Sequence, residues 1–376
     1  MSKKKVLIIL GLILLALVIL SDKDAKRENS KIPTPNSPGV QVPKPSAKVI
    51  PRGNRILAMH VNETPGVDFN SSLSAAQSAG VQAVGFSINW EDYEKSPKGY
   101  GADPNFLQVA NAYYPTKKIS LNVAIRPVDT NGYHLPSDLK GKRMNDPEVI
   151  ARFNSFLEYV LNQLKDVEIN YISIGNEVDI AFQKNKTEWE DFSVFLKETS
   201  ATARRLRANV PVGTIISFYG LTKNNPEESK KLAGISDAII TTYYPLDPLA
   251  DSVVKTSEEA RLELSNFLKT YPGKQVYFAE VGMPTSEILG GSFEKQADFV
   301  KMIFEFWDEN KDRIKLVAFL WLNDISKNQS KDFEKYYGIS DRKFLSYLET
   351  LGLRDSSGKN KPGFEVFKAE AGARGW

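Results

Sequence analysis

The chain has 376 residues, which is enough for one large domain or two medium-sized ones. Its 49 lysine and arginine residues nearly balance 46 aspartate and glutamate residues, so the net charge of +3 gives no reason to expect a nucleic-acid partner. The sequence has no cysteine, which excludes disulfides and a thiolate nucleophile, and only two histidines, which disfavours a histidine metal site or a Ser-His-Asp triad. We therefore expect chemistry carried by carboxylates, with neither a metal nor another cofactor.

The first 22 residues have the pattern of a targeting segment. Lysines at positions 3–5 precede an apolar run from Val6 to Leu20, and a positive flank before a short apolar run is typical of a secretory signal or an N-terminal anchor. Charged residues follow at once, so the small-residue pattern that favours cleavage is poor. We predict that residues 1–22 are a signal peptide or an uncleaved membrane anchor, and that the protein is extracytoplasmic, either secreted or attached to the membrane through this segment.

Residues 23–53 are polar and rich in proline, with motifs such as Pro33-Thr34-Pro35 and Val42-Pro43. Such a composition buries too little apolar surface to order itself. We predict a disordered, extended linker that leads to a single catalytic domain spanning residues 54–376.

From residue 54 onward, short apolar runs with the character of buried strands alternate with longer segments of helical periodicity. The predicted strands are Arg55–Val61, Ala83–Ile88, Ile119–Ile125, Tyr171–Ile174, Val212–Ile216, Ala238–Thr242, Gln275–Ala279 and Lys315–Leu322. The clearest predicted helices are Phe69–Ser78, Pro147–Leu164, Trp189–Arg207, Ser257–Lys269 and Glu294–Asn310. Strand and helix in repeated alternation are typical of a (β/α)8 barrel, which is an α/β fold.

A doubly wound open sheet is the alternative for this pattern. Nucleotide-binding proteins of that class carry a glycine-rich loop after the first strand, but here the first strand leads into Asn62-Glu63-Thr64. No Walker-type phosphate loop occurs in the sequence either. We therefore predict a single (β/α)8 TIM barrel.

Two of the predicted strands end in a glutamate. The fourth strand stops at Gly175-Asn176-Glu177, and the seventh stops at Glu280. Burying an unpaired carboxylate is costly, so a glutamate at such a position is normally paired or functional. The active site of a barrel lies at the carboxyl ends of its strands, where strands 4 and 7 lie across the mouth from each other. Two carboxylates there are the minimal set for retaining glycoside hydrolysis, one as the proton donor and the other as the nucleophile.

These two motifs resemble those of the retaining (β/α)8 glycoside hydrolase superfamily, in which an Asn-Glu pair ends strand 4 and a Glu ends strand 7. The finer similarity is to the β-1,3-glucanases of glycoside hydrolase family 17. Their strand-4 motif resembles Ile174-Gly175-Asn176-Glu177-Val178, and their strand-7 motif Glu-x-Gly-Trp-Pro-Ser resembles the sequence that begins at Glu280, with Met283 in place of the Trp. The endo-β-1,4-galactanase family has a similar Gly-Asn-Glu and is a rival match.

The resemblance implies roles for individual residues. Glu177 would be the acid/base and Glu280 the nucleophile, while Asn176 would bind the 2-hydroxyl of the sugar, a contact that strengthens in the transition state. Tyr243 and Tyr244, at the end of the sixth strand, could each donate a hydroxyl to the nucleophile. Because alternate strand residues face opposite ways, only one of them can point inward, and we favour Tyr243.

Five further residues are candidates for contact with the substrate. By the same resemblance, Trp321 near the end of the eighth strand would form the floor of the sugar site, with core packing as the alternative. Arg126 ends the third strand and could keep the nucleophile ionised, or it could form a structural ion pair. His60 could bind a sugar hydroxyl or be a structural residue, and Asn89 and Trp90 could line the cleft or pack a loop.

The sequence thus predicts a retaining glycoside hydrolase that acts on a β-linked oligosaccharide or polysaccharide, with β-glucan as the favoured substrate. Two alternatives use the same barrel. One is a non-catalytic carbohydrate-binding or cell-wall protein, and the other is a transglycosylase that passes the same covalent intermediate to a sugar instead of to water.

Overall fold

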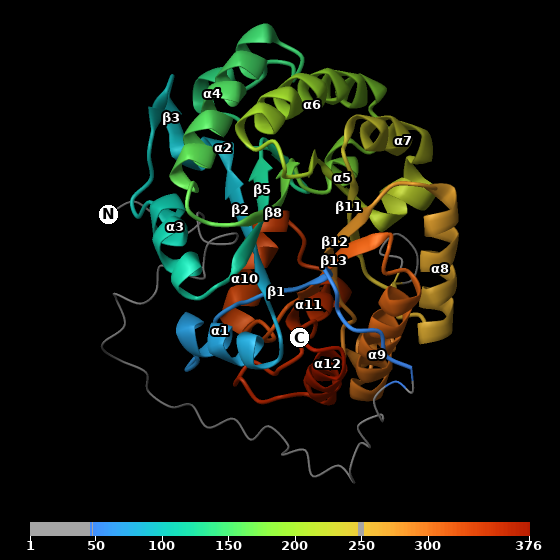
Figure 1. The fold of residues 1–376 in the computed structure, drawn as a ribbon. Coiled ribbons are helices and arrows are strands. Elements are labelled where there is room, and N and C mark those ends of the chain that lie inside the picture. The colour runs from blue at the N-terminus through green and yellow to red at the C-terminus, as the bar shows by residue number, and fades with distance from the viewer. Residues whose placement is uncertain (1–45, 47, 247–251) are drawn as a thin grey trace.

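The structure is a computed structural model that describes residue 46, residues 48–246 and residues 252–376 (Figure 1). The predicted targeting segment, residues 1–22, and most of the predicted linker lie outside these residues. Within the part of the chain that the structure describes, no helix is long and apolar enough to cross a membrane.

A parallel barrel forms the centre of the molecule, and all the predicted strands are present in it. Hydrogen-bonded neighbours follow the order β10-β11-β12-β13-β1-β2-β5-β8-β9. The strands are β1 (Ile56–His60), β2 (Ala83–Asn89), β5 (Ser120–Arg126), β8 (Ile169–Ile174), β9 (Val212–Gly213), β10 (Ile215–Ser217), β11 (Ile239–Tyr243), β12 (Val276–Val281) and β13 (Ile314–Leu320).

The barrel closes through one short stretch of chain, residues 212–217. The predicted fifth strand is interrupted at Thr214, so that β9 pairs with β8 and β10 pairs with β11. Because β13 pairs in parallel with β1, the ring of hydrogen-bonded strands is closed except between β9 and β10, which Thr214 connects. Two small antiparallel hairpins lie outside it, formed by β3 (Glu94–Ser96) with β4 (Gly99–Tyr100) and by β6 (Val128–Asp129) with β7 (Gly132–Tyr133).

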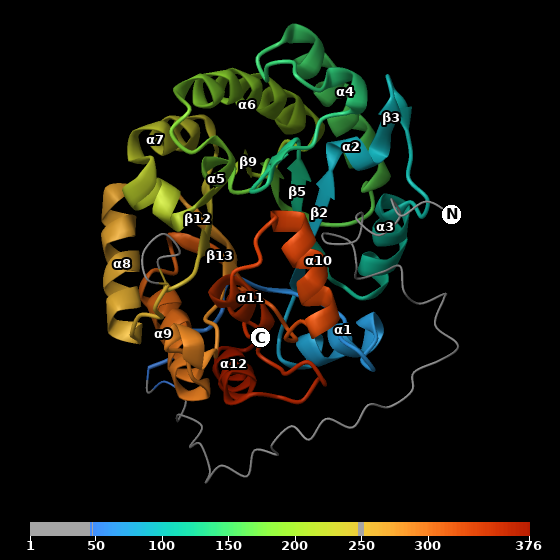
Figure 2. The same ribbon diagram turned by 180° about the vertical axis from the view of Figure 1, so that it is seen from behind.

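Helices surround the barrel, as Figures 1 and 2 show from opposite sides. They are α1 (Phe69–Ser78), α2 (Trp90–Tyr93), α3 (Phe106–Thr116), α4 (Pro147–Gln163), α5 (Val178–Phe182), α6 (Lys186–Leu206), α7 (Pro226–Ile235), α8 (Ser257–Thr270), α9 (Phe293–Glu309), α10 (Lys327–Tyr337), α11 (Arg342–Glu349) and α12 (Pro362–Ala373). The five predicted helices are confirmed to within a few residues. Helix α4 shows why: Asp146 caps its N-terminus, Pro147 occupies its first turn, and its apolar residues recur on the buried face.

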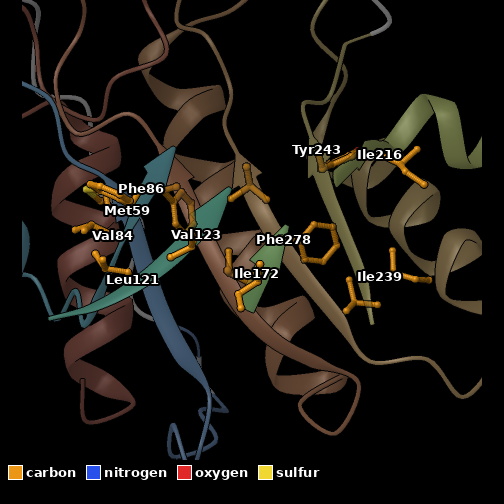
Figure 3. Packing of buried hydrophobic residues seen from close by; sticks show 14 of the residues in the cluster. Met59, Val84, Phe86, Leu121, Val123, Ile172, Ile216, Ile239, Tyr243 and Phe278 are labelled. Atoms are coloured by element: carbon orange, nitrogen blue, oxygen red, sulfur yellow. The ribbon is translucent and has the colours of Figure 1, made fainter. Parts of the chain in front are cut away.

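The core has two layers, because successive strand residues point to opposite faces. Outward-facing residues such as Met59 and Phe278 pack under the helices in the larger cluster, part of which Figure 3 shows. Inward-facing positions are often alanine, as in Ala58, and this leaves room inside the barrel for two aromatic rings. Tyr171 and Tyr277 meet there edge to face, with their ring centroids 5.8 Å apart.

The end of the barrel where the strands begin is held by a buried group of charges, which we call the basal ion network: Arg55, Asp308, Glu370 and Arg374. Asp308 accepts hydrogen bonds from both arginines, at 2.7 Å in each case, and Arg374 also binds Glu370. Ser46 hydrogen-bonds to Glu370, so the contacts of the domain extend into the predicted linker. The network joins the segment that precedes β1 to α9 and α12.

Candidate active site

A strained turn presents Glu177 at the opposite end of the barrel. β8 is buried throughout and ends at Ile174, after which Gly175 has a φ of 88° and Glu177 a φ of 42°. A left-handed glutamate is uncommon and costs conformational energy. A Cβ on Gly175 would come within 2.7 Å of Val178, which explains the glycine. The amides of Gly175 and Asn176 donate to the carbonyls of Ile125 and Val128, and these bonds hold the turn against the end of β5.

Glu280 is the last residue but one of β12, and it is half-buried like Glu177. Neighbouring residues at the end of β11 bind the two acids. The Thr242 hydroxyl donates to Oε1 of Glu177 at 2.5 Å, and the Tyr244 hydroxyl donates to Oε2 of Glu280 at 2.5 Å. Because residues i and i+2 of a strand share a face, these contacts bring the two acids to the same side of β11. We call Glu177 and Glu280 the carboxylate pair.

The environment of the carboxylate pair favours a proton on Glu177. Burial raises the pKa of Glu177 well above its usual range, and the charge of Glu280 raises it further, while the bond from Thr242 opposes both effects. Among the described residues, no lysine or arginine forms an ion pair with either acid. A carboxylic acid that keeps its proton next to a second carboxyl group is an arrangement suited to general acid catalysis.

The preference for Tyr243 over Tyr244 was wrong. Tyr243 is fully buried, and its hydroxyl donates to Glu263 on α8, outside the barrel. Tyr244 holds Glu280 instead. The faces follow the alternation along β11. Ile239 and Tyr243 belong to the outer core cluster and Ile240 to the interior one, so Thr242 and Tyr244 lie on the interior side.

Asn176 and Arg126 belong to one polar network whose centre is Asp129. Arg126 forms an ion pair with Asp129 at 2.9 Å, so the structural alternative for this arginine holds and the predicted contact with the nucleophile does not. The amide of Asn176 donates to Asp129 at 2.8 Å, and the Tyr336 hydroxyl donates to the same carboxylate. Burial opposes ionisation of Asp129, but the charge of Arg126 and these donors outweigh it and lower its pKa. The network fixes Asn176 next to Glu177.

The two candidates at the end of β2 differ. Trp90 is fully buried, donates from Nε1 to Glu94 at 2.6 Å and packs against Phe153 of α4, so the prediction that it lines the cleft was wrong. As the first residue of α2, it faces the helical layer and not the mouth. Asn89 is half-buried, and its Oδ1 has no hydrogen-bond partner among the described residues. Asn89 therefore stays a candidate for substrate contact.

His60 supports the backbone of β12. Its Nε2 lies 2.9 Å from the carbonyl oxygen of Ala279, the residue before Glu280. A Cβ on Gly85 would come within 2.3 Å of the imidazole, so the glycine makes room for the ring between β1 and β2. The structural alternative thus describes His60 better than the predicted sugar contact.

Trp321 follows β13 directly and is half-buried, with its ring 5.3 Å from that of Phe333. It belongs to a small aromatic cluster with residues of α10 and α11. Within the residues described, no group of three or more His, Cys, Asp or Glu side chains is arranged to hold a metal ion.

Sequence reasoning assigned no role to five residues that surround the carboxylate pair. They are Thr242, Asp129, Tyr336, Tyr337 and Tyr347. The polar ends of two predicted strands could have indicated Thr242 and Asp129. The tyrosines lie more than 50 residues from Glu280 in the sequence, between β13 and α12, and no local pattern connects them to the site.

Comparison with known proteins gives a fold but no family. No protein-family model matches the chain, and no curated protein matches its sequence. Solved structures do match. A variant of GH5_18 from Bifidobacterium longum subsp. longum, in complex with Manβ1-4GlcNAc, has a TM-score of 0.64 and 15% identity, with 84% of this chain and 78% of that chain covered.

Two further solved structures give the same result. The exo-β-1,4-mannosidase Op5Man5 from Opitutaceae bacterium strain TAV5 has a TM-score of 0.64 and 15% identity over 85% of this chain and 59% of that chain. The β-glucosidase from Thermotoga maritima, in complex with deoxynojirimycin, has a TM-score of 0.60 and 12% identity over 86% of this chain and 99% of that chain. At these identities the similarity shows a shared fold. The predicted TIM barrel is confirmed, and the finer similarity to glycoside hydrolase family 17 stays a prediction.

Proposed function

We propose that the protein is a retaining glycoside hydrolase that cleaves β-linked glycans, with Glu177 as the acid/base and Glu280 as the nucleophile. The observation that carries the proposal is the carboxylate pair. Two glutamates at the carboxyl ends of β8 and β12 interact electrostatically, and burial together with the charge of Glu280 raises the pKa of Glu177 well above its usual range. The shared fold with glycoside hydrolases supports this assignment.

In the first step, a carboxylate oxygen of Glu280 attacks the anomeric carbon. The bond from that carbon to the leaving oxygen breaks, and Glu177 gives its proton to this oxygen. The products are the free leaving group and a glycosyl ester on Glu280. The hydroxyl of Tyr244 holds the attacking carboxylate in place.

In the second step, water attacks the anomeric carbon and Glu177 accepts a proton from this water. The ester bond breaks and Glu280 departs as a carboxylate. The pair explains how Glu177 can change from acid to base. The charge of Glu280 raises the pKa of Glu177, and the ester removes that charge, so the pKa of Glu177 falls when a base is needed.

The substrate we propose is an oligosaccharide or polysaccharide with β-linkages. The two sequence motifs favour β-glucan. The names of the structural neighbours add β-mannosides and β-glucosides to the compounds worth testing, since one is an exo-β-1,4-mannosidase and another is a β-glucosidase. We also propose that residues 1–22 carry the enzyme out of the cytoplasm, either as a cleaved signal or as an anchor.

The test is turnover of a panel of β-glucans, galactans, mannans and xylans, together with aryl β-glycosides. Glu280→Gln and Glu177→Gln are compared with Glu309→Gln, a control at an exposed helix position. We expect Glu280→Gln to lose roughly 10⁵-fold in kcat, which is the scale for removal of a nucleophile, and the control to retain full activity. A Glu280→Gln enzyme as active as the wild type would overturn the proposal, as would a wild type that turns over no compound of the panel.

External azide separates the two roles. In Glu280→Ala, azide can replace the missing nucleophile and should give an α-glycosyl azide. In Glu177→Ala, azide should attack the glycosyl ester and give the β-glycosyl azide, because no general base is needed for an anion. The opposite assignment of products would exchange the roles of the two glutamates.

A further inference from the structure

The chain between β13 and α12, residues 321–361, forms a separate unit on the active-site end of the barrel. We call it the mouth insertion. It contains α10 and α11, which Figure 2 shows in front of the barrel strands. Its aromatic residues form a continuous cluster: Trp321, Phe333, Tyr336, Tyr337, Phe344 and Tyr347.

One end of the mouth insertion is tied to the loop after β12. The hydroxyls of Ser286 and Ser346 form a hydrogen bond, and the amide of Thr285 donates to the carbonyl of Thr350 at 3.1 Å. The buried Lys361 binds Asp324 at 2.7 Å. The insertion is therefore a fixed part of the fold at this side of the mouth.

The other end reaches the loop after β5. Tyr336, the last residue but one of α10, donates its hydroxyl to Asp129, and its carbonyl accepts a hydrogen bond from Asn131 at 3.4 Å. In the barrel order, β13, β1 and β2 lie between β12 and β5. The mouth insertion thus spans the arc of the mouth that these three strands form.

Two tyrosines of the insertion adjoin residues that hold the carboxylate pair and its neighbour Asn176. The ring of Tyr347 meets that of Tyr244 edge to face at 5.3 Å, and Tyr244 in turn holds Glu280. Tyr337 is the next residue after Tyr336 in the sequence, and its ring packs against that of Phe344 with the ring centroids 5.2 Å apart. Burial raises the pKa of both Tyr337 and Tyr347, and the charges of Glu177 and Glu280 act on both hydroxyls, which agrees with this position.

The roles proposed for Glu177 and Glu280 determine which part of a substrate would contact the mouth insertion. Glu177 must reach the leaving oxygen to protonate it, so the leaving group lies on the side of β8. The sugar that Glu280 attacks, with anything attached to its far end, then lies toward the opposite arc, formed by β13, β1 and β2. The mouth insertion spans that arc.

We propose that the mouth insertion closes the sugar site beyond the ring that Glu280 attacks, so that the enzyme removes single sugars from the non-reducing end of a β-linked chain. The inference rests on the proposed function and assigns its mode of action. Tyr337 and Tyr347 are the specificity-determining residues, because a second sugar on the glycone side would occupy their space. The mouth insertion would exclude a second sugar through a steric clash, and not because an attractive contact is missing.

The first test uses β-linked tetrasaccharides of glucose and of mannose, labelled at the reducing end. We expect the labelled product to shorten by one sugar at a time, with monosaccharide as the other product from the earliest time points. Release of labelled fragments from internal bonds at those time points would overturn the inference while leaving the hydrolase intact. A wild type that cleaves no β-glycoside at all would instead overturn the proposed function and the inference together.

The second test measures how strongly the mouth insertion excludes a second sugar. The test compares direct release of the aryl group, with free disaccharide as the sugar product when the substrate carries two sugars. The ratio of kcat/KM for this reaction with one sugar to that with two should be on the order of 100-fold in the wild type. Tyr337→Ala and Tyr347→Ala should each lower this ratio roughly 10-fold, because the space opens for a second ring. The ratio cancels any general loss of activity, and thermal unfolding identifies variants that fail to fold.

Tyr113→Ala on α3 is the matched control. This tyrosine lies on the outer surface of the barrel and hydrogen-bonds to Asn70, far from the mouth. The Tyr113→Ala variant should leave the kcat/KM ratio for one and two sugars unchanged. An equal preference for one and two sugars in the wild type would contradict the inference, as would Tyr337 and Tyr347 variants that keep the wild-type ratio.

Discussion

The two ends of the barrel treat acidic side chains in opposite ways. At the end where the strands begin, Asp308 and Glu370 of the basal ion network are each bound by Arg374, and Asp308 also by Arg55. At the end where the strands finish, the carboxylate pair has hydroxyl partners, Thr242 and Tyr244, and no cationic partner among the described residues. Both groups of acids are buried or half-buried.

The difference separates stability from chemistry. Removing a buried carboxylate that has two arginine partners leaves uncompensated charges in the protein. A half-buried carboxylate beside another carboxylate keeps its proton to a higher pH, which costs folding energy but provides an acid. Residues that hold the fold and residues that react can thus be told apart by the charge of their neighbours.

The largest expected effect on stability is at the base. Asp308→Asn leaves Arg55 and Arg374 buried without their shared partner, and we expect it to lower the free energy of unfolding by about 3–5 kcal/mol. Chemical denaturation measures this loss. Glu309→Gln, which removes an exposed partner of Arg261, should cost less than about 1 kcal/mol. Similar losses for both variants would remove the distinction drawn for the base.

At the mouth, replacing Tyr243 and replacing Tyr244 should have very different effects on kcat. Tyr244→Phe removes a hydrogen bond to the charged Glu280 and should lower kcat by about 10–100-fold, since bonds to charged groups contribute about 1.5–3 kcal/mol. Tyr243→Phe removes bonds to Glu263 and to the carbonyl of Ala260, both on the helical side, and should leave kcat nearly unchanged. Steady-state kinetics of the two variants compare them directly, and a larger loss in Tyr243→Phe would refute the assignment of their faces.

Thr242→Val tests how the proton on Glu177 is controlled. Its hydroxyl lowers the pKa of Glu177, so its removal should raise that pKa further. Because the protonated form is the active acid, the alkaline limb of the kcat/KM profile should move to higher pH, with roughly a 10-fold loss at the optimum from poorer orientation. Thr241→Val, at the preceding residue, is the matched control. A limb that stays in place or moves to lower pH contradicts this role.

The smallest effect is a gain in stability. The pKa of Glu177 is raised in the folded protein, so its ionisation favours the unfolded chain as the pH rises above the ordinary glutamate range. Glu177→Gln should therefore raise the unfolding free energy by about 1 kcal/mol at alkaline pH, as removal of a strained functional group often does. The gain should vanish at pH values below the ordinary glutamate pKa. Thermal melting across pH shows whether it does.

Much of the fold could be predicted from the sequence, because apolar periodicity and strand–helix alternation are local properties. The eight strand positions and the two glutamates at strand ends follow from such patterns. The split of the fifth strand at Thr214 could not, since it depends on how two neighbouring strands share one stretch of chain.

The site was harder to predict where the role of a residue depends on the direction in which its side chain points. Tyr243 and Tyr244 are neighbours of the same type, and only the face of β11 on which each lies separates them. Trp90 and Arg126 stand at strand ends but find partners in Glu94 and Asp129. The tyrosines of the mouth insertion are brought in by tertiary packing alone.

The covalent intermediate offers the most direct test of the central claim. A 2-deoxy-2-fluoro β-glycoside with a reactive leaving group should form the ester quickly and hydrolyse it slowly, because the fluorine destabilises the cationic transition states of both steps. Mass spectrometry of the digested protein should find one sugar attached to the peptide that contains Glu280. An adduct on any other residue, or none in an enzyme that is inactivated by the reagent, would contradict the account.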